Sequence, residues 1–317
     1  MNISVIIPNY NGAEIIRKNL PIVLDIFEQY KSKYKNEVEV IIVDDGSTDT
    51  SREILADMFG NYTKSVAVRF LFNHKNFGFS TTVNKGVAAA KGEIVILLNT
   101  DVVPEKGFIE PLLTHFTDEK VFGVGCMDKS IENGKTVLRG RGIGRWENGL
   151  LVHSAGDLGK TNTLWVSGGS GAFRTSLWEK LGGLSEIMNP FYGEDIDLGY
   201  RALKSGYTLL FEKESVVTHL HEEGSIKTTQ SAKNILATTY RNQQLITFMN
   251  VTDTTIIFSY LLFSPKRLLH AIRERKKGYL SGLLQAYGLF FQTLSYRYRN
   301  KKLFTHTDQE IERQIVI

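Results

Sequence analysis

The chain has 317 residues, of which 42% are hydrophobic and 23% charged, a composition typical of a folded protein with a sizeable core. Six prolines and no low-complexity run argue against long disordered stretches, and the single cysteine, Cys126, excludes an intrachain disulfide. The formal net charge of +4 is mild, but lysine and arginine concentrate in residues 266–302. The first residues carry no basic segment, so we expect no secretory signal peptide and a cytoplasmic location.

Short apolar runs alternate with amphipathic stretches over the first hundred residues. Strands are predicted over residues 3–7, 38–43, 66–72 and 94–98, and helices over residues 13–34, 50–59 and 79–90. This alternation with short connections predicts a Rossmann-like α/β fold, in which helices cover both faces of a mostly parallel sheet.

A polar cluster follows each predicted strand, at residues 9–11, 44–49, 73–78 and 99–101. In open α/β sheets the ligand binds beyond the carboxyl ends of the strands. The four clusters therefore predict one binding site along that edge.

The later chain changes character twice. Residues 121–173 are glycine-rich and predict antiparallel strands or loops beside the main sheet, and residues 176–207 hold two helical patterns. Helical patterns dominate from about residue 233, so we divide the chain into a catalytic domain (residues 1–225) and a helical extension (residues 226–317). The apolar stretches 256–263 and 279–294 are shorter than the roughly 20 residues that span a bilayer.

Two acidic positions at strand ends are candidate ligand contacts. Asp101 directly follows a buried strand, where one carboxylate and a nucleoside diphosphate can together hold Mg²⁺ or Mn²⁺; the alternative is a turn or cap residue. In the second, the adjacent acids Asp44 and Asp45, a carboxylate can accept a hydrogen bond from the imide N–H of uracil or thymine. The alternative for Asp44 is capping of the next helix, which Ser47 and Asp49 already serve.

The acids Glu194 and Asp195 form a second cluster with Asp197, next to an aromatic pair. A carboxylate in such a place suits removal of a proton from an attacking hydroxyl, and two neighbouring acids can divide the base and positioning roles. The alternative is an N-cap cluster. His219 and His221 have the spacing of one strand face and are candidate metal ligands, or else structural residues.

In this order the clusters resemble family 2 glycosyltransferases of the GT-A fold, over residues 3–225. The resemblance rests on the segments VIIPNYNG, VIIVDDGSTD, NFGFSTTVNKG, ILLNTDV, VSGGSGAF, FYGEDIDLGYRALKSGY and HLHEEGS.

The resemblance implies a role for each site residue. It places at the nucleotide-sugar Pro8, Tyr10, Asn11, Asp44, Asn76, Gly78, Asn84, Asn99 and Thr100. It places at the donor sugar or the acceptor Trp165, Gly171, Ala172 and Arg201, the last of which pairs with the acids or contacts the diphosphate. It assigns to the metal Asp101 and one of the two histidines. Asn99 replaces the first acid of the family's Asp-X-Asp motif, as in rhamnosyltransferase-like relatives, and this favours dTDP-rhamnose-like donors among the UDP and dTDP sugars.

The implied reaction is a single displacement with inversion, in which Asp195 deprotonates a hydroxyl of a glycan or lipid-linked acceptor of cell-surface polysaccharide synthesis. The alternative is a catalytically degenerate nucleotide-sugar-binding module, which would lack the base or the metal acid. A nucleotidyltransferase or a nicotinamide-dependent enzyme is disfavoured because no glycine-rich loop follows the first strand.

The basic bias lies in the tail alone, without an aromatic platform, and this disfavours nucleic-acid binding. Residues 264–300 instead predict amphipathic basic helices that rest on the inner leaflet of a membrane, near a lipid-linked acceptor. The alternatives are a solvated face and a helical dimer contact.

Overall fold

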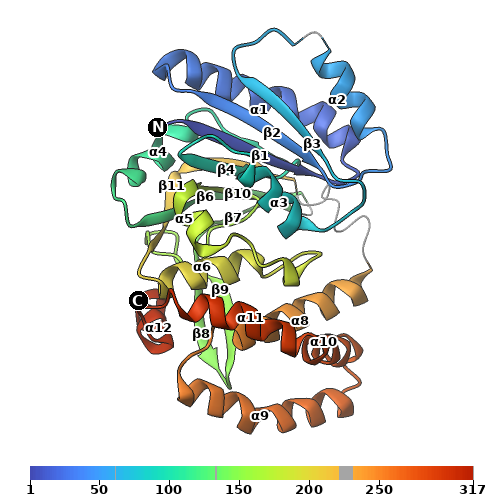
Figure 1. Cartoon of the computed structure of the whole chain (residues 1–317), viewed down its shortest axis with the longest axis vertical. Helices are drawn as coiled ribbons and strands as arrows, with labels where there is room; N and C mark the ends of the chain where they lie inside the picture. The colour runs from blue at the N-terminus through green and yellow to red at the C-terminus, as the bar shows by residue number, and fades with distance from the viewer. Residues whose placement is uncertain (61, 133, 221–230, 317) are drawn as a thin grey trace.

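The computed structural model describes residues 1–60, 62–132, 134–220 and 231–316, and Figure 1 shows a central sheet between layers of helices. Its strand order is β3-β2-β1-β4-β10-β6-β11-β5, with β7 paired to β6. The parallel half consists of β1 (Ile3–Asn9), β2 (Val38–Asp44), β3 (Ala67–Phe72) and β4 (Ile94–Leu98). These are the four predicted strands, and the predicted α/β class is confirmed.

The other half of the sheet is mixed. It contains β5 (Val102–Pro104), β6 (Val121–Glu132), β7 (Lys135–Arg139), β10 (Ser170–Arg174) and β11 (Thr208–His219). Strand β10 runs antiparallel to β4 and β6, whereas β11 runs parallel to β6. The glycine-rich middle segment was expected beside the sheet, but β6, β7 and β10 lie within it. Only β8 (Gly142–Glu147) and β9 (Leu150–Ala155) form a separate hairpin.

Helices cover both faces of the parallel strands, which explains their continuous apolar sequences. Val5 and Ile7 of β1 pack with α1 (Ala13–Tyr34), while Ile6 between them packs with α3 (Phe79–Ala88). The other helices of this region are α2 (Ser51–Phe59), α4 (Ile109–Thr114), α5 (Thr175–Leu181) and α6 (Glu194–Lys204).

The rest of the described chain is helical, as predicted. It comprises α8 (Ala232–Asn250), α9 (Thr254–Arg273), α10 (Lys277–Gly288), α11 (Phe290–Lys301) and α12 (Asp308–Val316). Among the described helices, none is both long and apolar enough to cross a membrane.

These helices pack on the sheet domain through buried polar contacts as well as apolar ones. Lys204 of α6 is fully buried, and its Nζ atom lies 2.8 Å from Asp308 Oδ1 and 3.1 Å from the carbonyl oxygen of Asn250. Ile311 and Ile315 of α12 belong to the same apolar core as α3 and α6. The division at residues 225 and 226 falls outside the described residues and stays a prediction, but the two parts share one core.

Candidate active site

The carboxyl ends of β1 and β2 are joined by a buried network around Asp44. The Asp44 carboxylate is fully buried and accepts hydrogen bonds from Asn9 Nδ2 at 2.9 Å, Arg52 Nε at 2.9 Å and Ser47 N at 3.1 Å. Through these three hydrogen bonds, the Asp44 carboxylate holds the ends of β1 and β2 together. The carboxylate has no surface open to a base in this structure, so its role as partner of a base imide stays a prediction.

The loops after these strands are fixed in the same way. Asn11 donates from its backbone N–H to Ser47 Oγ at 2.9 Å and accepts from Thr48 N at 2.8 Å, and this places the half-buried Pro8 and Tyr10 at the edge. Asp45 accepts from the N–H groups of Phe77 at 3.0 Å and Gly78 at 2.9 Å. The neighbouring Asn76 is exposed there.

The turn at Gly168 and Gly169, which we call the glycine turn, contacts both the end of β4 and the start of α6. The Asn99 N–H donates to the carbonyl of Gly169 at 2.9 Å, and a Cβ atom on Gly169 would lie 2.6 Å from Asn99 Nδ2. The backbone N–H of Gly168 bonds the Asp195 carboxylate from the other side of the turn. The turn therefore holds the predicted base next to the strand end that leads to Asp101.

Asp195, the candidate base, and its neighbour Glu194 lie in a buried environment that disfavours ionised carboxylates. Burial, and then repulsion from Asp195, raise the pKa of Glu194 to about 8, and burial also raises the pKa of Asp195. Glu194 is 6% exposed, whereas Asp195 keeps part of its surface open. Because Glu194 holds its proton near neutral pH, Asp195 is the member of the pair that is free to accept one.

Asp101 and His219 come together, as the metal assignment requires. Asp101 Oδ2 lies 3.4 Å from His219 Nε2, and His219 Nδ1 lies 2.9 Å from Asp128 Oδ2. Burial alone would lower the pKa of His219, but the two carboxylates raise it to about 9. His221, the other candidate, lies outside the described residues.

With its raised pKa, His219 is protonated and paired with both carboxylates here, so binding a divalent ion would displace its proton. The neutral imidazole and the Asp101 carboxylate would fit an ion that takes its remaining ligands from diphosphate and water. Within the described parts of the chain, no group of three or more His, Cys, Asp or Glu residues is placed to hold a metal ion. The donor set therefore fits an ion shared with a ligand, rather than one held by protein alone.

Tyr192 lies two residues before Glu194 and was not assigned to the site from the sequence. Its backbone is left-handed, with φ of 70°, and its side chain is 40% exposed. Burial, followed by the charges of Glu194 and Asp101, raises the pKa of Tyr192. An aromatic residue two positions before the acids was the available signal.

Buried polar atoms without a partner gather at this edge. Among the described residues, side-chain atoms of this kind include Asn9 Oδ1, Ser80 Oγ, Asn99 Oδ1 and Glu194 Oε2. Three further atoms of this kind, Gln244 Nε2, Arg267 Nε and Asn300 Oδ1, lie in the C-terminal helices. Since buried polar groups are nearly always hydrogen-bonded in proteins, the four at this edge are consistent with a site that binds a polar ligand.

The sequence matches the family described as Glycosyl transferase family 2 over residues 4–182, which is more than half of the chain. The chain belongs to glycosyltransferase family 2. The matched region contains the strand-end clusters, Asp101 and the glycine turn, but it ends before Asp195 and His219.

Curated relatives of this family 2 glycosyltransferase include two bacterial proteins. The pre-mycofactocin glycosyltransferase of Mycobacterium tuberculosis is 28% identical over 228 residues, which cover 69% of this chain and 43% of that protein. The O-antigen chain rhamnosyltransferase WbaN of Salmonella anatum is 27% identical over 223 residues, covering 69% and 66% respectively. The matched part is thus less than half of the first relative and about two thirds of the second.

Two solved structures share the fold. S. aureus TarS 1–349 in complex with UDP-GlcNAc aligns with a TM-score of 0.60 at 17% identity, covering 99% of this chain and 91% of that one. GalNAc-T7 with UDP, GalNAc and Mn²⁺ aligns with a TM-score of 0.65 at 17% identity, covering 94% and 57%. At this identity the likeness shows the GT-A fold.

Three residues assigned to the sugar site in this glycosyltransferase lie in the core instead. Arg201 is 2% exposed, and its guanidinium pairs with Asp197 and donates to two backbone carbonyls, so it pairs with an acid as expected but does not face a sugar. Gly171 and Ala172 are buried within β10 between β4 and β6. Their assignment to the segment that shapes the sugar site stays a prediction. Trp165 is half-buried, 5.5 Å from the His153 ring between centroids, and remains a candidate sugar contact.

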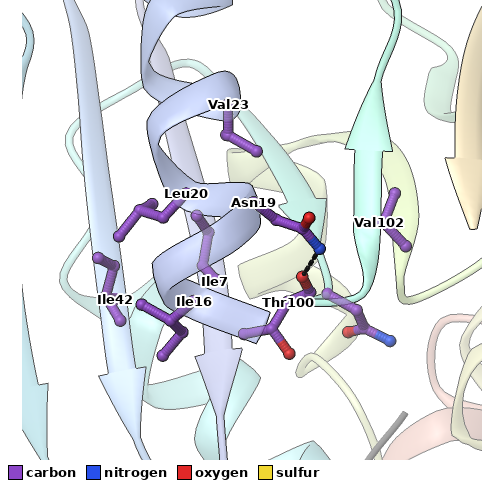
Figure 2. A pocket seen from close by; sticks show the side chains of 9 residues that line it. Ile7, Ile16, Asn19, Leu20, Val23, Ile42, Thr100 and Val102 are labelled. Atoms are coloured by element: carbon purple, nitrogen blue, oxygen red, sulfur yellow. Dashed lines mark hydrogen bonds between the residues drawn. The ribbon is translucent and has the colours of Figure 1, made fainter. Parts of the chain in front are cut away.

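Asn84 and Thr100 also have protein partners. Asn84 Nδ2 donates to the Leu184 carbonyl at 2.9 Å, and thereby ties α3 to the loop before the base. The Thr100 carbonyl accepts a hydrogen bond from Asn19 Nδ2 of α1 at 2.9 Å, next to a cavity of about 10 Å³ lined mainly by apolar side chains (Figure 2). A cavity of this size holds one water at most. This small cavity, which lies beside Thr100 and α1, is therefore not the donor site.

Proposed function

We propose that the chain transfers a sugar from a UDP- or dTDP-linked donor to a hydroxyl of a glycan or lipid-linked acceptor, with inversion at the anomeric carbon. The observation that supports this most directly is the glycine turn at Gly168 and Gly169, which contacts Asn99 at the end of β4 on one side and Asp195 on the other. A base on one side and a site for the diphosphate on the other are the two requirements of a single displacement at an anomeric carbon.

The acceptor hydroxyl gives its proton to Asp195. Gly168 N–H holds this carboxylate in place, and its raised pKa suits acceptance of a proton near neutral pH. The neighbouring Glu194, protonated below a pKa of about 8, adds no second charge that would repel an ionised Asp195. We assign Asp195 as the base and Glu194 as its positioning partner.

The leaving diphosphate lies by Asp101 and His219 in this proposal. A bound Mg²⁺ or Mn²⁺ would neutralise charge on the diphosphate. Asp101 and His219 are the residues that would hold the ion, and the Asn19 hydrogen bond to Thr100 fixes the turn that carries Asp101. A role in cell-surface polysaccharide synthesis is proposed because the relatives include an O-antigen chain rhamnosyltransferase.

Isothermal calorimetry with UDP, dTDP and GDP, each with and without Mn²⁺, tests the donor and metal assignments. We expect metal-dependent binding of one pyrimidine diphosphate that Asp101→Ala abolishes. Asp25→Ala, which removes an exposed acid of α1, is the matched control and should bind like wild type. Absence of binding for all three nucleotides would favour a degenerate or partner-dependent module. The anomeric configuration of the product, read by NMR, tests inversion.

A further inference from the structure

Helix α9 has two apolar faces, of which one is used inside the protein. Ile256, Tyr260 and Ala271 are buried, and Tyr260 packs against Gly149 at the tip of the β8–β9 hairpin. The Tyr260 hydroxyl donates to Gln244 Oε1 of α8 at 2.8 Å. This inner face fixes the helix on the body of the molecule, so the other face is presented to the surroundings in a defined orientation.

The outer face of α9 is an exposed apolar stripe. It consists of Phe258, Leu261, Leu262, Leu269 and Ile272, each more than half exposed. Their spacing of three, four and seven residues places them along one side of the helix, opposite Tyr260. Single exposed leucines are ordinary, but a continuous stripe of large apolar side chains marks a contact surface.

Helices α10 and α11 also expose large apolar side chains. Leu284 of α10 is 74% exposed, and Phe291 and Tyr298 of α11 are 82% and 69% exposed. Figure 1 shows α9 at the end of the molecule opposite α1 and α2. The described chain therefore leaves the outer stripe of α9 uncovered at that end of the molecule.

The positive charge beside the α9 stripe indicates which kind of surface covers it. Lys266 and Arg273 are exposed, seven residues apart, on the edge of the α9 stripe. Residues 266–302 contain ten lysines and arginines and one acid, Glu274. A second copy of the chain on this face would oppose one basic surface with another, because a two-fold interface pairs a patch with itself. An anionic lipid surface offers both an apolar layer and opposite charge.

We propose that α9 lies in the interface of an anionic bilayer, with its outer stripe among the acyl chains and its basic edge at the headgroups. The proposal goes beyond the transfer reaction and does not depend on it. It sharpens the expectation for residues 264–300: the inserting stripe begins before that segment, at Phe258, and belongs to one face of α9. A membrane-bound protein would meet a lipid-linked acceptor at that surface.

Vesicle flotation tests the proposal with the full chain. Wild type should float with phosphatidylcholine vesicles that contain roughly a third phosphatidylglycerol, and less with pure phosphatidylcholine or at high salt. Leu262→Ser with Leu269→Ser should lose most of the binding, and Lys266→Glu with Arg273→Glu should lose binding to anionic vesicles. Ile22→Ser, at an exposed position of α1, is the matched control and should bind like wild type. Thermal unfolding checks that every variant folds.

A site-specific probe reports which face is inserted. Because Cys126 is buried, a cysteine introduced by Leu269→Cys can be labelled selectively with an environment-sensitive fluorophore. Its emission should shift to the blue with anionic vesicles, whereas the label at Ile22→Cys should not respond. No flotation of wild type at low salt, or equal responses from both labels, would overturn the proposal. A wild-type dimer that vesicles do not dissociate and that Leu262→Ser with Leu269→Ser separates would assign the face to a second copy instead.

Discussion

Glu194 is a buried carboxylate whose Oε2 atom accepts no hydrogen bond from the described residues. Its pKa, raised to about 8 by burial and by Asp195, means that the folded protein binds this proton more tightly than the unfolded chain. Stability from this group is therefore fully present below the unfolded pKa of about 4.3 and is lost as pH rises toward about 8.

We predict that Glu194→Gln is more stable than wild type at about pH 8.5, by on the order of a few kcal/mol, because glutamine carries no charge to bury. The difference should shrink toward about pH 5, where the wild-type side chain is protonated. Urea unfolding at both pH values measures it. Glu147→Gln, at an exposed position, should show no such dependence, and a Glu194→Gln difference that is equal at both pH values would contradict the prediction.

Asp195 gives a prediction on activity. Asp195→Asn keeps the size of the side chain and removes the proton acceptor, so we expect kcat to fall by about 10²- to 10⁴-fold while nucleotide binding is unchanged. For wild type, kcat/KM should rise with pH through the raised pKa of Asp195. Initial rates with donor and acceptor, together with calorimetry, measure both effects. Retained activity in the variant would assign the base to another residue.

The acids of the site could be predicted from the sequence because each follows a recognisable pattern, a buried strand or the start of a helix. Tyr192 could not be singled out, because its place beside the acids depends on a left-handed backbone, with φ of 70°, that the local sequence does not indicate. Arg201 was assigned in part to the wrong place for a similar reason: sequence shows a charge near the base but not that the charge points into the core.

At the scale of elements, α8 holds the loop that carries Tyr192. Asn242 Nδ2 donates to the carbonyls of Tyr192 at 2.6 Å and Met188 at 2.8 Å, and Arg241 Nη2 donates to the carbonyls of Met188 at 3.0 Å and Asn189 at 2.5 Å. A helix from the extension thus sets the backbone just before the base. The periodicity of the sequence predicted this helix, but contacts across about 50 residues leave no trace in a local pattern.

We predict that Asn242→Ala lowers kcat by roughly 10- to 100-fold, because the loop loses the donor that fixes Tyr192 and the acids after it. The KM for the nucleotide-sugar should change less, because Asn189, which accepts from Ser80 N, keeps its own hydrogen bond from Arg241. Gln243→Ala is the matched control, because its Nε2 atom bonds the Leu151 carbonyl of the hairpin instead. Steady-state kinetics of both variants measure kcat and KM separately. Equal losses of kcat in the two would show a general effect on folding.

At the scale of the whole molecule, the sheet domain and the C-terminal helices form one cooperative unit. Asp197 of α6 accepts a hydrogen bond from Asn250 of α8 at 2.6 Å, and Asp308 of α12 pairs with Lys204. Burial alone would raise the pKa of Asp308, but Lys204 and hydrogen bonds hold it below its ordinary value, whereas burial lowers the pKa of Lys204. Each charge is stable in the core because the other part of the chain supplies its partner.

We therefore predict that a chain ending at residue 230 does not fold by itself, although residues 3–225 carry the family motifs. It would remove the hydrogen-bonding partners of the buried Lys204 ammonium, take the Asn250 hydrogen bond from Asp197, and expose the core face of α6. Solubility and a cooperative thermal transition by circular dichroism measure this.

The variant Asp308→Ala tests the same contact in the full chain. It should lower the free energy of unfolding by about 3–5 kcal/mol, against little change for Asp25→Ala. A soluble, cooperatively unfolding shortened chain would restore the division into two independent domains, and near-normal stability of Asp308→Ala would show that the buried pair is not what joins them.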